Sequence, residues 1–185
     1  YGLSDHTALV FVLAQICGAI ATSFFQGVVA DHTGPRPLLI LYGFLLVMVC
    51  SLWTLAPARF NWAYTAAIFV LNGVVAMGVP LSLSHYFLVA TDETDRVAIG
   101  MFRMVSGGIC AGLAGALIGS GLVRLLQHLD FSGLALYKTY FSVLPLILVP
   151  LILVLMQLER LQDWRVRSVV GLFLSPRDIR ALYAL

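Results

Sequence analysis

The stretch GVVADHTGPRPLL, residues 27–39, places a short polar turn between two long apolar runs. The run before the turn covers residues 8–30, and the run after it covers residues 37–56. An α-helix needs about 20 mostly apolar residues to cross the hydrocarbon core of a bilayer, and each run reaches that length. The stretch therefore predicts a hairpin of two membrane-spanning helices.

Three further apolar runs of the same kind follow along the chain. They cover residues 62–90, 97–126 and 140–158. The connections between the runs are too short to hold a soluble domain. We therefore predict an all-α polytopic membrane protein, in which residues 1–158 form a bundle of five transmembrane helices and residues 159–185 form a basic cytoplasmic tail or linker.

The composition excludes several other classes of protein. Of the 185 residues, 61% are hydrophobic and 11% are charged, whereas a soluble domain has about 45–50% and about 25%. A net charge of +2 is too small for a nucleic-acid binder. Cys17, Cys50 and Cys110 lie inside apolar runs and make no metal-ligand spacing. Because no nucleophile–base set or metal cluster is visible, we expect no enzyme, metal or cofactor.

The distribution of Lys and Arg predicts the orientation in the membrane. Five spans alternate in direction and place eight cations on one side and three on the other. The first side carries Arg36, Arg96, Arg103, Arg160, Arg165, Arg167, Arg177 and Arg180, and the second carries Arg59, Arg124 and Lys138. We therefore expect the first side to be cytoplasmic, together with the C-terminal tail, and Tyr1 to face outward.

The five spans differ in polarity. The second and fifth are almost purely aliphatic and aromatic, whereas the first, third and fourth are rich in small and polar residues. Small residues let helix backbones approach closely, and polar groups in a span are costly unless they face protein or water. We therefore expect the first, third and fourth spans to form the interior, with two small-residue spacings in the fourth span packing against a neighbour. These spacings are Gly108-x-x-x-Gly112 and Gly115-x-x-x-Gly119.

The turn after the first span resembles the signature of the major facilitator superfamily, G-x-x-x-D-[R/K]-x-G-x-[R/K]-x-x-L. Gly27, Asp31, Gly34, Arg36 and Leu39 match this pattern, whereas the next position after the aspartate holds a histidine. The second glycine of the signature, Gly34, suits a tight turn, because glycine adopts a positive φ at little cost. We expect the first glycine to allow close helix contact, the aspartate to meet a helix N-terminus, and the arginine to pair with carboxylates or lipid phosphate.

The resemblance implies that Asp31 and Arg36 act as a latch between two halves of a transporter during conformational change. In family terms the five spans correspond to helices 8–12 or 2–6 of the twelve, and the first helix of the half and the whole other half lie outside the chain. The lack of an arginine near Asn72 and the presence of His32 favour the C-terminal half. The glycines at 108–115 are similar to a motif of the N-terminal half, so that assignment stays open.

Four polar side chains within the spans are candidates for contact with a solute. Gln15, Asn72 and His85 are candidate cavity-lining residues, although Asn72 and His85 lie about 140° apart on a straight helix unless Pro80 bends it. Asn72 also fits a bridge between helices, and His85 fits either a proton carrier or a packed histidine bonded to a backbone carbonyl or Ser82. Gln26, like Gln15, fits either a solute contact or a hydrogen bond between helices. No Asp or Glu lies deep in a span, so coupling to protons would reside in the missing half, or the protein would be a uniporter.

We therefore expect transport of a small solute by alternating access in the inner or plasma membrane. The expected partners are the lipid bilayer, the missing half of the same transporter and a small-molecule substrate of unknown class, and nucleic acid is not expected. A non-transporting membrane scaffold held by the same glycine packing is the alternative. That alternative predicts that Asp31 and Arg36 can be changed freely.

Overall fold

Five helices long and apolar enough to cross a membrane make up the computed structural model, which describes residues 4–158 apart from the side chains of Val28, Asp31 and His32. In chain order the elements are α1 (Asp5–Thr33), α2 (Pro35–Thr54), α3 (Trp62–Ala90), α4 (Arg96–Ala114), η1 (Gly115–Gly119), α5 (Ser120–His128) and α6 (Gly133–Gln157). The run from α4 to α5 is continuous and forms one span. The prediction of an all-helical chain with five such helices is confirmed, and the predicted tail at 159–185 lies outside the described residues.

Side-chain caps set where two of the helices begin. The hydroxyl of Ser4 accepts a hydrogen bond from the backbone N–H of Thr7 at the start of α1, at 3.4 Å. The side-chain oxygen of Asn61 accepts one from the backbone N–H of Tyr64 at the start of α3, at 3.0 Å. Such caps satisfy N–H groups that have no partner within the helix. The helices begin close to the predicted positions except for α6, which begins at Gly133 rather than at residue 140.

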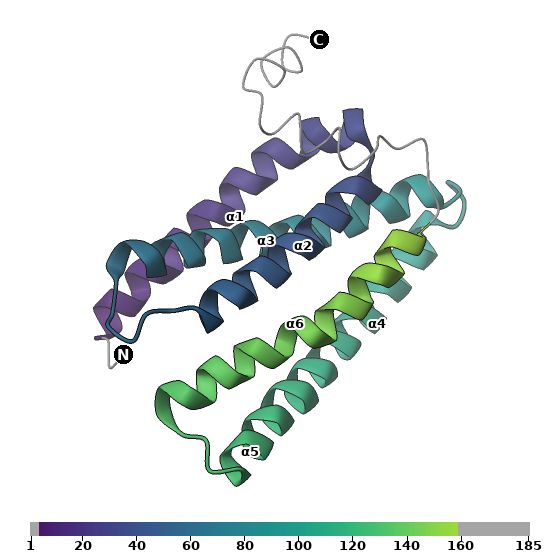
Figure 1. The fold of residues 1–185 in the computed structure, drawn as a ribbon. Coiled ribbons are helices and arrows are strands. Elements are labelled where there is room, and N and C mark those ends of the chain that lie inside the picture. The colour runs from purple at the N-terminus through teal and green to yellow at the C-terminus, as the bar shows by residue number, and fades with distance from the viewer. Residues whose placement is uncertain (1–3, 159–185) are drawn as a thin grey trace.

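Helices α1 and α3 cross at close range because two glycines remove the side chains that would separate them (Figure 1). A Cβ built on Gly18 would overlap the backbone carbonyl of Val70, and a Cβ built on Gly73 would overlap the backbone carbonyl of Gln15. Small residues permit this direct contact between main chains. Any side chain added at either glycine must therefore push the two helices apart.

Helix α2 packs between α3 and α6, and it is the most buried of the five spans. In its most apolar window 44% of the residues are buried, compared with 6% in α6. Leu38 and Tyr42 pack against the end of α1, and Val49 packs against Ile68 and Val75 of α3. The expectation that the second span is peripheral is therefore wrong for the described bundle. Its aliphatic side chains fill the space between the neighbouring helices. Helix association in lipid depends on such van der Waals packing, so an apolar helix can take a central place.

The run from α4 to α5 is as little buried as α6. In its most apolar window only 6% of the residues are buried. In Figure 1 it forms a hairpin with α6, and its first turns contact the end of α3 through Arg103 and Ser84. A Cβ on Gly108, Gly112 or Gly115 would meet no atom within 4 Å, and one on Gly119 would meet only the Tyr140 hydroxyl, at 3.7 Å. The expected glycine packing of the fourth span is therefore absent among the described residues, since no helix lies close enough to use it.

Candidate functional site

The turn between α1 and α2 is the first part of the candidate site. Gly34 ends α1 and begins α2 with φ 82° and ψ 158°, and its N–H donates to the carbonyl of Ala30 at 2.9 Å. Only glycine adopts this region without strain. Pro35 then occupies the first turn of α2, where its missing N–H costs no hydrogen bond. The positive φ expected at Gly34 is confirmed.

Arg36 connects this turn to the end of α6. Its guanidinium Nη2 donates a hydrogen bond of 2.6 Å to the backbone carbonyl of Met156, in the last turn of α6. Carbonyls at a helix C-terminus lack partners within the helix and carry partial negative charge, so a cation is stabilised there. The guanidinium Nε is buried and makes no hydrogen bond to a described residue. The contact expected for Arg36 was a carboxylate or a lipid phosphate, and the described partner is instead a backbone carbonyl.

Two further signature residues, Gly27 and Asp31, lie on α1. Asp31 lies in the last turn of α1, and its side chain is outside the described part of the structure. A Cβ on Gly27 would meet no described atom within 4 Å, so the close helix contact expected there is not found. The reason is geometrical, because Gly27 follows Gly18 by nine residues and thus points about 180° away from the face that meets α3.

A buried hydrogen bond joins α1 to α3 below the turn. Gln26 Nε2 donates to the Ser82 hydroxyl at 2.8 Å and approaches the Gly78 carbonyl at 3.3 Å. Gln26 is only 4% exposed, and its Oε1 has no hydrogen-bond partner among the described residues. The side chain also lines a mainly apolar pocket of about 300 Å³ between α1, α2 and α3. Of the two roles open for Gln26, the structure shows the hydrogen bond between helices.

The three candidate cavity residues are half-buried, and the structure does not bring them together. The backbone of Gln15 lies against Gly73, so Gln15 is close to the position of Asn72 in the crossing. His85 lies 13 residues after Asn72 on α3, which is about 20 Å along a helix axis. Helix α3 continues through Pro80 without interruption. None of the three is among the lining residues of the pocket beside Gln26.

Sequence reasoning missed the two glycines of the crossing. Gly18 and Gly73 were visible only as small residues in polar spans, because neither belongs to a G-x-x-x-G spacing. A signal was nonetheless present in α1. Gly18, Thr22 and Gln26 recur every four residues, share one face of the helix and are all buried.

The described polar contacts of the site are contacts between helices. Within residues 4–158, no group of three or more His, Cys, Asp or Glu side chains could hold a metal ion. Its polar contacts are a cation on a helix C-terminus and a buried amide–hydroxyl hydrogen bond. Compared with known proteins, the chain matches no family model, no curated protein and no solved structure.

Proposed function

We propose that this chain is part of a transporter of the major facilitator type, which moves a small solute across the membrane by alternating access. The single observation that carries this proposal is the hydrogen bond from Arg36 to the Met156 carbonyl. This bond joins the turn between α1 and α2, which resembles the major facilitator signature, to the end of α6. A latch needs a contact that a single side-chain movement can break. One charge-assisted bond to a helix end is of that kind.

The uneven burial of the described bundle supports the same proposal. The α1–α3 pair is tightly packed, whereas α4 has no buried residue and exposes large apolar side chains, among them Phe102 and Met104 at 75% each. A half-bundle that lacks its first helix and the opposite half would leave such a face uncovered. The proposed partners are therefore the bilayer, the remaining helices of the same transporter and a small-molecule substrate, and the shared end of α1 and α6 is proposed to be cytoplasmic.

The test is uptake by the full-length protein in proteoliposomes, with a panel of radiolabelled sugars, amino acids, nucleosides and cationic drugs. For a solute that is taken up, Arg36→Gln and Asp31→Asn are expected to slow uptake at least tenfold while the amount of folded protein stays unchanged. Arg59→Gln is the matched control, because Arg59 is exposed in the loop between α2 and α3 and so lies at the other end of the bundle.

Two outcomes would contradict this assignment. Uptake at the wild-type rate in both the Arg36→Gln and Asp31→Asn variants would remove the latch. Absence of uptake for every solute, together with free substitution at both positions, would favour the non-transporting scaffold.

A further inference from the structure

A pocket of about 250 Å³ lies where the last turns of α3 meet the first turns of α4. Ser84, Phe87 and Leu88 of α3 contribute to its lining, and so do Arg96, Ile99 and Arg103 of α4. Two of these residues are cations, and no carboxylate is present among the described lining residues. The pocket therefore combines apolar walls with two cations, one of which, Arg96, lies 3.8 Å from Glu93 in the adjoining acidic loop.

Arg103 leaves part of its hydrogen-bonding capacity unused inside this pocket. Its Nη2 donates to the Ser84 hydroxyl at 2.5 Å, and its Cζ lies 5.2 Å from the centroid of the Phe87 ring. Its Nη1 is buried and has no hydrogen-bond partner among the described residues. A buried charged donor without an acceptor is costly. An anion that enters the pocket lined by Arg103 would supply the acceptor that this guanidinium lacks.

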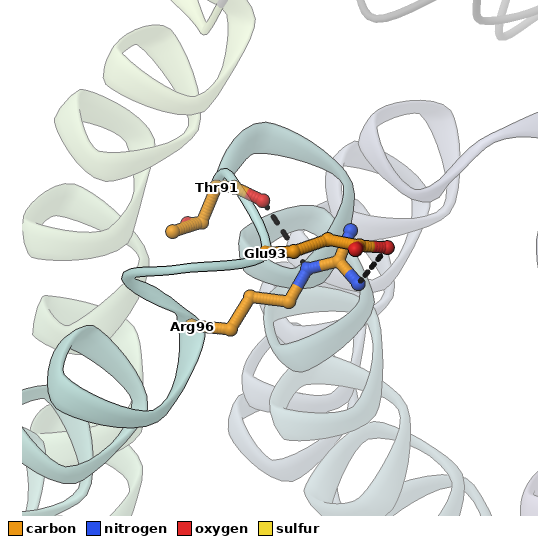
Figure 2. A network of polar contacts seen from close by, with 3 residues as sticks. All are labelled: Thr91, Glu93 and Arg96. Atoms are coloured by element: carbon orange, nitrogen blue, oxygen red, sulfur yellow. Dashed lines mark hydrogen bonds and ion pairs between the residues drawn. The ribbon is translucent and has the colours of Figure 1, made fainter.

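Arg96 supplies the second cation at the mouth of the pocket. Figure 2 shows its Nε directed to the Thr91 carbonyl, at 3.2 Å, and its Nη1 near Glu93 Oε1, at 3.8 Å. The Arg96 and Glu93 side chains are 41% and 89% exposed, so this ion pair neutralises little of the arginine charge. Arg96 and Arg103 are seven residues apart, which places them on one face of α4 about 10 Å apart along the axis.

We propose that this pocket binds the phosphate of an anionic lipid headgroup. The guanidinium group of an arginine binds phosphate oxygens through paired N–H donors. Arg103 would bind the phosphate within the pocket, and Arg96 would attract it at the mouth. A lipid is favoured over a soluble phosphate ester because the pocket lies at the end of two membrane-spanning helices. Leu88 and Met104 of its lining are 55% and 75% exposed, and they offer a surface for an acyl chain.

The test measures lipid binding to the detergent-solubilised full-length protein by native mass spectrometry. The probes are dioleoyl phosphatidylglycerol, dioleoyl phosphatidylcholine and sn-glycerol 3-phosphate. We expect phosphatidylglycerol to bind most tightly, and Arg103→Gln to weaken its binding about tenfold, as the loss of a charge-assisted contact predicts. Arg103→Lys keeps the charge but loses the fork, so an intermediate loss is expected. Arg124→Gln is the matched control, since this exposed arginine lies at the other end of the same helical run.

Two outcomes would overturn the proposal. Equal binding of phosphatidylglycerol to wild type, Arg103→Gln and Arg96→Gln would remove the pocket as the site. Tighter binding of glycerol phosphate than of the lipid would replace the lipid with a soluble phosphate ester. If Arg103→Gln fails to fold, Arg96→Gln tests the pocket instead, because the Arg96 side chain is partly exposed. We expect that variant to bind phosphatidylglycerol about threefold more weakly, since the contact faces solvent.

Discussion

The crossing of α1 with α3 and the glycine run of α4 use the same residue in opposite ways. At the crossing, Gly18 and Gly73 each lie against the main chain of the opposite helix. In the α4 run, Gly108, Gly112 and Gly115 face no described atom within 4 Å, although they have the spacing that usually marks helix packing. Spacing therefore identifies a surface that is able to pack. Only the position of a second helix decides whether that surface does so.

The largest effect is expected from filling the crossing. Gly73→Leu places a branched side chain where the Gln15 carbonyl now lies, so the helices must separate. We expect the free energy of unfolding to fall by about 3 kcal/mol or more, the upper range for overpacking. Gly121→Leu is the control, because open space surrounds that glycine in α5. Reversible unfolding of the full-length protein in bicelles measures both, and equal losses would contradict the crossing.

A second variant distinguishes the need for a special backbone torsion from the need for close approach. Gly34→Ala keeps the residue small but forces a Cβ into a backbone region that is essentially restricted to glycine. A loss of roughly 2 kcal/mol in unfolding free energy is expected. Gly27→Ala, in the same helix pair but with nothing within 4 Å among the described residues, should cost nothing. A harmless Gly34→Ala would show that the turn has another conformation.

The buried hydrogen bond of the crossing predicts a smaller effect. Ser82→Ala removes the hydroxyl that accepts from Gln26 and leaves a buried amide with only the longer contact to Gly78. Hydrogen bonds between membrane helices are worth about 0.6–1.7 kcal/mol, and we expect a loss in that range. Ser23→Ala is the matched control, since the exposed Ser23 hydroxyl bonds only to its own helix, at the Ala19 carbonyl. Equal melting shifts for the two variants would contradict the role of Gln26.

The smallest effect on folding, with a large effect on function, is expected in the glycine run. Gly112→Leu meets no described neighbour, so the amount of folded protein in fluorescence-detected size exclusion should not change. If the rest of the transporter packs on this face, uptake by the same variant should fall at least tenfold. Uptake at the wild-type rate would show that the face meets only lipid.

Features that depend on local residues could be predicted from the sequence, whereas features that depend on which helices become neighbours could not. The number of spans followed from apolar length, and the positive φ at Gly34 followed from turn chemistry, because both depend on local residues. The central place of α2 and the uncovered face of α4 depend on which helices become neighbours. Composition contains little of that information, since lipid tails are as apolar as a leucine side chain. The signature singled out Arg36, but the carbonyl that it contacts belongs to Met156, 120 residues away, and could not be read from spacing.

The most direct test of this account is a structure of the full-length protein in lipid nanodiscs. We expect α1 and α3 still to cross at Gly18 and Gly73, and another helix of the same protein to lie against the glycines at 108–119 of α4 and η1. A full-length structure in which lipid alone covers that face would contradict the assignment of this chain to one half of a larger transporter.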